Sequence, residues 1–217
     1  SGSTLVLGAL FFTFQIYCDF SGYSDIALGT ARLLGIELLR NFSFPYFSRD
    51  IAEFWRRWHI SLSSWFRDYL YIPLGGSKGS TWIKVRNTFI VFLVSGFWHG
   101  ANWTFIAWGL LNAIYIMPSI LMKSNRNNLD TVAQGKLFPS GRELISILIT
   151  FSLTVFAWIF FRSESIGNAF AYISEMFSMS LFTKPTVMPI ILFVLLGVFL
   201  IIEWLGREQK YAIETFG

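Results

Sequence analysis

The segment from Thr88 to Met122 contains no Asp, Glu, Lys or Arg, and it exceeds the stretch of about 20 apolar residues that one membrane-spanning helix needs. Near its centre lies His99, in the run Ser95-Gly-Phe-Trp-His-Gly-Ala-Asn102. An ionisable side chain at membrane depth is energetically costly, so it is a functional-site candidate by default. The segment restricts the chain to folds whose helices cross or enter a bilayer.

The composition extends this conclusion to the whole chain. Of 217 residues, 54% are hydrophobic and 14% are charged, whereas soluble domains average about 25% charged. We therefore predict a single all-α integral membrane domain over residues 1–217, a transmembrane helix bundle with interfacial and re-entrant helices. The net charge of +4 is interleaved with apolar surface, and this argues against nucleic-acid binding.

Four apolar stretches predict the helices that meet the membrane: residues 5–20, continuing as a more polar helix to near Gly35, then 88–122, 144–161 and 187–202. Residues 88–122 are too long for one span and too short for two with a loop. We expect a short or re-entrant helix to about Trp98, followed by a full span. This path places the 123–142 connection across the membrane from residues 36–86.

Residues 36–86 form an aromatic and basic segment. Nine of the 17 Lys and Arg lie between Arg32 and Arg86, against four acids. Basic loops of this kind face the cytoplasm more often than not. They also suit anionic lipid headgroups or a phosphate-bearing donor.

Helical spacing over residues 50–70 separates two faces. The aromatic face carries Trp55, Trp58, Leu62, Trp65 and Tyr69, and the polar face carries Arg56, His59, Ser63 and Arg67. Such a helix either lies at the membrane interface, aromatic side down, or lines a polar cavity. His59 is then either a solvated surface residue or part of a phosphate site beside two arginines.

The first helix carries a polar stripe of Tyr17, Ser21, Ser24, Asp25 and Arg32. We interpret it mainly as a packing network, with Asp25 and Arg32 as a candidate ion pair, and secondarily as a catalytic element. Cys18 is the only cysteine, so an intrachain disulfide and a multi-cysteine metal site are excluded. We predict no metal site.

His99 has two interpretations. It is either a core histidine that bonds a helix carbonyl or a general base that deprotonates a hydroxyl, and the membrane environment favours the general base. Gly96 and Gly100 permit close backbone approach beside it. Asn102 is a candidate to orient its ring.

Together, these segments resemble the membrane-bound O-acyltransferase family, and most closely its bacterial branch that contains the membrane subunit of alginate O-acetyltransferase. The matching motifs are Asp19-Phe-Ser-Gly-Tyr-Ser-Asp25, Asn41-Phe42, Pro45-Tyr46, Glu53-Phe-Trp-Arg-Arg-Trp-His-Ile-Ser-Leu-Ser64, Trp65-Phe-Arg-Asp-Tyr-Leu-Tyr-Ile-Pro-Leu-Gly-Gly76, Arg86-Asn87, Phe97-Trp-His-Gly-Ala-Asn102 and Ala157-Trp-Ile-Phe-Phe-Arg162. Family members carry more helices before this region, so we expect the C-terminal portion of such a protein.

The resemblance implies a tunnel through the bilayer with His99 as general base and His59 as the second family histidine. The donor is a cytoplasmic thioester such as acetyl-CoA or an acylated carrier protein, with no bound cofactor. The implied partner is an extracytoplasmic SGNH-type acetyltransferase, the acceptor is a polysaccharide, and the location is the bacterial inner membrane with several spans. Candidate supporting residues are Asp25, Arg56, Arg57, Ser63, Arg67, Asp68 and Asn102.

Two alternatives remain at this point. Within the family, the reaction could be D-alanyl transfer to teichoic acid or peptidoglycan O-acetylation. Outside it, the histidines could relay protons in a transporter. Transporters commonly show inverted repeats, and the sequence has no internal repeat.

Overall fold

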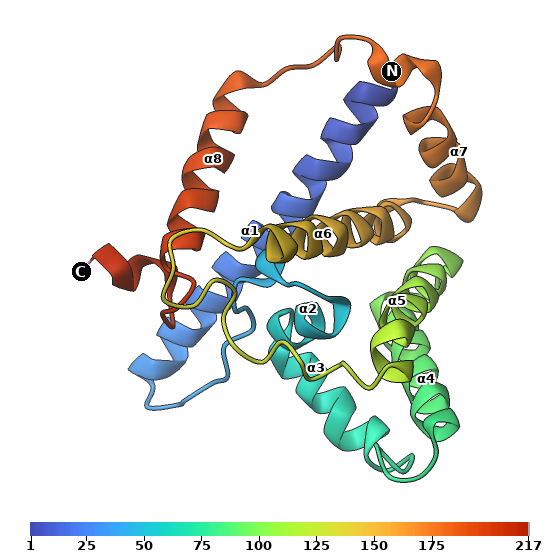
Figure 1. Ribbon diagram of the computed structural model, residues 1–217, viewed down its shortest axis with the longest axis vertical. Helices are drawn as coiled ribbons and strands as arrows, with labels where there is room; N and C mark the ends of the chain where they lie inside the picture. Colours follow the sequence, from blue (N-terminus) through green and yellow to red (C-terminus); the bar gives the residue numbers. More distant parts are fainter. Residues whose placement is uncertain (217) are drawn as a thin grey trace.

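The computed structural model describes residues 1–216, and between them it contains helices and no strand. The α-helices are α1 (Gly2–Leu33), α2 (Ile51–Arg57), α3 (Ile60–Phe66), α4 (Thr81–His99), α5 (Trp103–Leu121), α6 (Gly141–Arg162), α7 (Ile166–Met176) and α8 (Ile190–Leu205) (Figure 1). Shorter helical turns are η1 (Pro45–Phe47), η2 (Arg67–Tyr71, a π-helical turn), η3 (Met179–Phe182) and η4 (Ala212–Phe216). The all-α prediction is confirmed.

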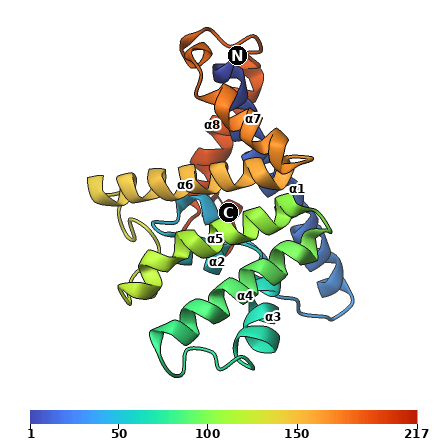
Figure 2. The same cartoon turned by 90° about the vertical axis from the view of Figure 1, so that its right-hand side faces the viewer.

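Helices α1, α5 and α6 are long and apolar enough to cross a membrane. Helix α8 is apolar but has only 16 residues, fewer than the usual span. Helix α6 lies across α1 (Figures 1 and 2). The chain is therefore a membrane protein, as its composition predicts.

Helices α4 and α5 form an antiparallel hairpin joined by residues 100–102. A Cβ atom on Gly109 would clash with the carbonyl oxygen of Phe92, and one on Gly96 would clash with that of Phe105. Since real Cβ atoms do not approach so closely, only glycine permits this contact between the two helix backbones.

The hairpin corrects the expected chain path. Helix α4 begins at Thr81 rather than at Thr88, so α4 and α5 have 19 residues each. Because the two helices are antiparallel and equally long, the end of α5 returns to the side of the hairpin on which α4 begins. The connection after α5 consequently packs on residues 49–57, where Arg49 and Asp130 form an ion pair at 3.0 Å. The prediction that residues 123–142 lie across the membrane from residues 36–86 is wrong.

The single helix expected over residues 50–70 is also wrong, because the chain breaks at His59. This residue has φ +45°, in the left-handed region, and it separates α2 from α3. The backbone groups freed by the break bond to an adjacent extended segment: Ser43 N–H donates to Arg57 O and Ile60 N–H donates to Asn41 O, both at 3.0 Å. Tertiary hydrogen bonds thus replace those of a continuous helix.

The break sends the expected aromatic face partly into the protein. Trp58 is buried, and its ring contacts those of Phe42 and Trp158 at centroid distances of 4.9 and 5.3 Å. Trp65 and Tyr69 remain exposed. Residues 51–66 therefore fit the interpretation of a cavity-lining segment better than that of a helix lying flat on the membrane.

The polar stripe of α1 contributes to packing. Tyr17 O–H donates to Glu203 on α8 at 2.8 Å, and Asn41 Nδ2 donates to the Ser24 hydroxyl at 3.2 Å. Among residues 1–216, Arg32 pairs with Glu37 and not with Asp25. The packing network is present, but the proposed Asp25–Arg32 ion pair is not.

The close approach of α4 and α5 predicts a selective effect of one added methyl group. Gly109→Ala should lower the free energy of unfolding by about 1–3 kcal/mol, because the core must be overpacked to accept it. The measurement is the thermal unfolding midpoint in detergent.

The matched control is Gly197→Ala in α8, where nothing lies within 4 Å of an added Cβ. It should be neutral or stabilising by up to about 1 kcal/mol, since Ala is the better helix former. Equal midpoints for the two variants would contradict the close packing.

Candidate active site

A cavity of about 880 Å³ lies between the α2–α3 segment and the α4–α5 hairpin. One side of α4 lines it through Lys84, Thr88, Ser95 and His99, residues at helical spacing. Lys84 and His99 are 15 positions apart, so at about 1.5 Å per position the cavity follows α4 for about 22 Å. His59 lines the same cavity. The fold thus joins two histidines that are 40 positions apart in the sequence.

The His99 end of the cavity is aromatic. The imidazole lies at centroid distances of 4.9 Å from Trp98, 5.0 Å from Phe161 and 5.2 Å from Trp108. His99 is the last residue of α4, and Gly100 ends the helix with its N–H bonded to Phe97 O. The imidazole therefore lies at the C-terminal end of α4, where a helix carries a partial negative charge.

Within residues 1–216, no protein group hydrogen-bonds the His99 imidazole, so its nitrogens are available to a molecule in the cavity. Asn102, expected to orient it, instead caps α5 by accepting from Thr104 N–H and donates to Glu164 O at 2.9 Å. The described residues also hold no group of three His, Cys, Asp or Glu placed to bind a metal ion.

His59 faces the cavity from the α2–α3 break. Its ring lies 4.6 Å from that of Phe20 and 6.4 Å from that of Trp98, which also contacts His99. Burial, and secondarily the nearby His99, lower the pKa of His59 from 6.5 to about 4. Its Nδ1 atom is buried without a hydrogen-bond partner in the described chain. His59 is consequently neutral near pH 7.

The other end of the cavity is basic. Lys84 lies in the first turn of α4, and Lys123 and Arg126 follow α5. No described residue in the lining is acidic, and within residues 1–216 these three side chains make no ion pair or hydrogen bond. Cations without counterions concentrate positive potential at this end, which favours a phosphate or another anion.

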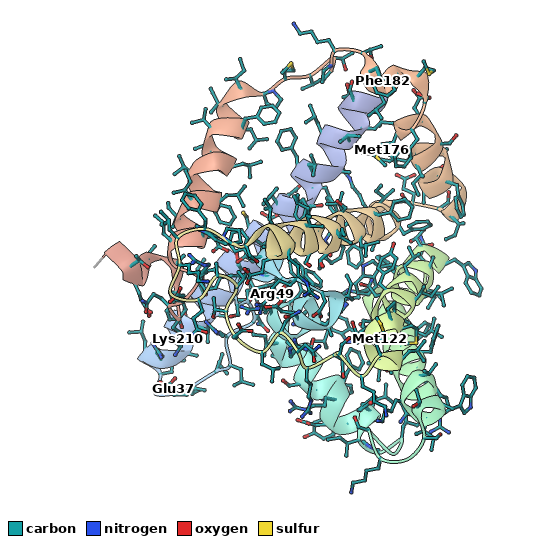
Figure 3. All side chains as sticks on the ribbon, viewed as in Figure 1. Glu37, Arg49, Met122, Met176, Phe182 and Lys210 are labelled. Carbon is teal, nitrogen blue, oxygen red and sulfur yellow. The ribbon has the colours of Figure 1, made fainter. Side chains whose placement is uncertain are left out.

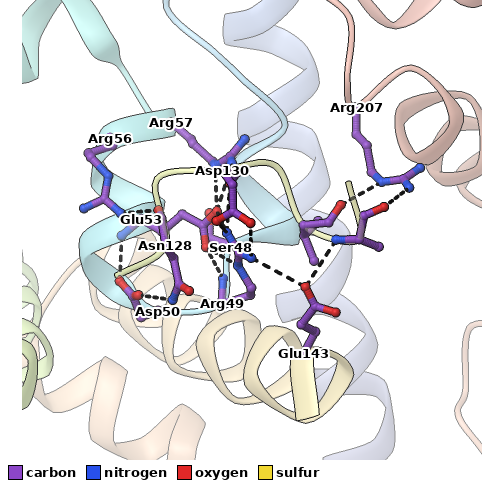
Figure 4. Close-up of polar contacts among 12 residues, drawn as sticks. Ser48, Arg49, Asp50, Glu53, Arg56, Arg57, Asn128, Asp130, Glu143 and Arg207 are labelled. Atoms are coloured by element: carbon purple, nitrogen blue, oxygen red, sulfur yellow. Dashed lines mark hydrogen bonds and ion pairs between the residues drawn. The ribbon is translucent and has the colours of Figure 1, made fainter. Parts of the chain in front are cut away.

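Arg56 and Arg57, candidate donor-binding residues, serve largely to hold the connection between α5 and α6. Arg56 lines the cavity, but its guanidinium donates to Asn125 O and Asn128 O, both at 2.7 Å. Arg57 does not line the cavity; it pairs with Glu53 at 2.9 Å and donates to Asp130 O. These contacts, shown in part in Figure 4, hold residues 125–130, of which Asn125, Arg126 and Leu129 line the cavity.

Arg49 lies at the centre of this network (Figures 3 and 4). It pairs with buried Glu53 at 3.1 Å, with Asp130 at 3.0 Å and with Glu143, the third residue of α6, at 3.5 Å. The hydrogen bonds from Arg49 lower the pKa of Asp130. This network was not predicted, because Arg49, Asp130 and Glu143 lie far apart in the sequence, among other polar residues.

Of the remaining predicted site residues, two line the cavity and two lie outside it. Ser63 and Arg67 line the cavity, and Arg67 is paired with Asp68 at 2.7 Å. Asp68 lies outside the lining. Asp25 lies on a second, smaller pocket beside Glu203.

Five lining residues were not predicted from the sequence: Lys84, Lys123, Arg126, Trp108 and Phe161. The series Lys84, Thr88, Ser95, His99 has helical spacing, so it could have been found if α4 had been predicted to start at Thr81. Phe161 lies in the 157–162 motif of the family resemblance, but nothing in the sequence distinguishes it or Trp108 from other apolar residues as part of a cavity.

The geometry can be compared with known proteins. A sequence profile of the membrane-bound O-acyltransferase family matches residues 1–139. The chain belongs to this family. The resemblance drawn from the motifs is confirmed, and both cavity histidines lie within the matched region.

Similar proteins include probable alginate O-acetylases. That of Pseudomonas aeruginosa is 45% identical over 172 residues, which is 79% of this chain and 31% of the relative. That of Azotobacter vinelandii is 38% identical over 97% of this chain and 41% of the relative. A peptidoglycan O-acetyltransferase of Helicobacter pylori is 42% identical over 77% of this chain and 30% of the relative. The chain spans about a third of the length of these relatives.

Proposed function

We propose that the intact protein is a multi-pass O-acyltransferase of the bacterial inner membrane. It takes an acyl group, most simply acetyl, from a cytoplasmic thioester and passes it toward a cell-envelope polysaccharide. The observation that carries the proposal is one cavity with two histidines at an aromatic end and, at the other end, cations that pair with no described residue. The names of the relatives, alginate and peptidoglycan acetylating proteins, support the polysaccharide as acceptor. An SGNH-type extracytoplasmic partner that completes the transfer belongs to the same proposal.

The donor enters at the basic end. Lys84, Lys123 and Arg126 bind its phosphates, and the thioester reaches along the α4 stripe toward His99. Acetyl-CoA and an acylated carrier protein both carry phosphate on the thiol-bearing arm, so the same cations serve either donor. Nothing in this arrangement needs a resident cofactor.

His99 acts as general base. It removes the proton from an acceptor hydroxyl while the hydroxyl oxygen forms a bond to the thioester carbonyl carbon. The C–S bond then breaks, and the thiolate takes the proton from the imidazolium, which returns His99 to its starting state. The C-terminal end of α4 stabilises the transient imidazolium by about 0.3–1 kcal/mol.

His59 donates a hydrogen bond to the carbonyl oxygen as negative charge develops there. A neutral imidazole carries one N–H. Nδ1 is the buried nitrogen of this ring. We therefore place the proton on Nε2, from which it can be donated into the cavity and stabilise the tetrahedral intermediate.

The central test is His99→Ala in the intact protein, with polymer-linked acetate as the readout. Loss of the general base should lower kcat/KM by about 10²- to 10⁴-fold, while the thermal unfolding midpoint stays near that of the unmodified protein. Acetylation at the unmodified level would show that His99 is not the base.

His59→Gln and His59→Asn test the donor role. The Gln amide nitrogen takes the place of Nε2 and the Asn amide nitrogen that of Nδ1, so the Gln variant should keep activity within about tenfold and the Asn variant should lose about 10²- to 10³-fold. Asn is the better residue for the left-handed conformation of position 59, so backbone strain cannot produce this order. The reverse order would contradict the assignment.

The basic end predicts a change in donor affinity. Replacing Lys84, Lys123 and Arg126 by Met should raise the KM for the thioester by roughly ten- to a hundredfold, at about 0.5–1 kcal/mol for each lost charge, with kcat little changed. The control is Lys136→Met, an exposed cation of the same connection outside the cavity lining. Equal KM values for the two proteins would place the donor elsewhere.

A further inference from the structure

The wall of the cavity beside His99 consists of aromatic rings in mutual contact. Trp108 and Trp158 stack at a centroid distance of 5.7 Å and an interplanar angle of 18°. Phe161 completes the wall, with its centroid 5.3 Å from Trp108 and 5.1 Å from Trp158. All three rings line the cavity. The three rings thus form one contiguous aromatic wall beside His99.

This wall limits the length of the acyl chain that the donor can carry beyond its carbonyl carbon. In the proposed function, His99 deprotonates the hydroxyl that attacks this carbon, so the carbon lies near the imidazole and the rest of the acyl group lies against the surrounding rings. Phe161 lies 5.0 Å from His99 and Trp108 lies 5.2 Å from it. A methyl group needs little room there, whereas each further methylene must displace a ring from a close-packed layer.

The three rings differ in how firmly they are held. Trp108 and Trp158 are 2% and 3% exposed and belong to the central aromatic core, so their removal would damage the fold. Phe161 is only partly buried and lies one residue before the end of α6. It can therefore be shortened while the stacked tryptophans remain.

We infer that Phe161 sets the length of the acyl group, and that the protein transfers two-carbon acyl groups because this ring closes the cavity beside His99. The inference rests on the proposed function and deepens it, since it names the substrate class of the same site. Shortening Phe161 removes the part of the wall nearest the reacting carbon and extends the space available to the chain.

The experiment uses the intact protein with acetyl, butyryl and hexanoyl thioesters of one carrier, and it compares kcat/KM for each. The unmodified protein should prefer acetyl, and Phe161→Ala should raise the butyryl-to-acetyl ratio by about tenfold or more for each methylene accommodated. Phe161→Leu should give an intermediate ratio, and it serves as the test if the Ala variant does not fold.

The matched control is Phe160→Ala. Phe160 is the neighbouring residue, is more deeply buried, and contacts Phe156 and Phe170 rather than His99. Its loss should reduce stability at least as much and leave the butyryl-to-acetyl ratio unchanged. The inference would be overturned if both Phe161 variants had the same butyryl-to-acetyl ratio as the unmodified protein.

The outcomes separate this inference from the proposed function. Acyl transfer that persists in His99→Ala, or is absent from the unmodified protein, contradicts the proposed function. Transfer that depends on His99 but shows the same chain-length preference in all Phe161 variants contradicts only the role of Phe161.

Discussion

The buried carboxylate of Glu53 is the constraint on which the arrangement around the cavity depends. It is 1% exposed, and burying an unpaired charge costs several kcal/mol, so it requires cations beside it. Arg49 and Arg57 supply them, and both arginines extend to Asp130 in the connection between α5 and α6. One buried charge on α2 thereby holds together α2, the segment before it at Arg49 and the α5–α6 connection at Asp130. These contacts fix the position of the C-terminal end of α2. His59 lies two residues after that end.

The position of His59 also requires the break in the helix. A continuous helix would have left the 41–43 segment without backbone partners, whereas the break gives its Ser43 N–H and Asn41 carbonyl the partners Arg57 O and Ile60 N–H. The same break sends Trp58 into the aromatic core and leaves His59 on the cavity. At the other end of the cavity wall, Gly96 and Gly109 let α4 and α5 touch, so that His99 and Trp108 meet across the hairpin. Backbone contacts thus position both histidines.

Much of this could be predicted from the sequence. The charge-free run, the abundance of aromatic residues and the low charge content indicate an all-α membrane protein, because only helices satisfy their backbone groups inside a bilayer segment of that kind. The motifs around His59 and His99 indicate the family, which the profile match confirms. The helical spacing over residues 50–70 predicts a single helix, and this prediction is wrong because local periodicity does not reveal the hydrogen bonds that Asn41 and Ser43 make at the break beside His59. The prediction of the chain path after α5 was wrong for a related reason. Helix α4 starts among charged residues, and a hydropathy criterion excludes these from a predicted apolar segment.

The sequence by itself determined the class of the protein and its family, and it identified the two histidines as candidate site residues. These conclusions follow from composition and from short local motifs. The tertiary structure alone decided what surrounds them. It assigned Arg56 and Arg57 to holding a connection, left Lys84, Lys123 and Arg126 without an ion-pair partner in the described part of the chain, and placed Phe161 against His99. The physical reason is that a charge or a ring acquires its role from its neighbours. An arginine bonded to carbonyl oxygens has little left for a ligand, and a phenylalanine limits a substrate only where its ring closes a cavity.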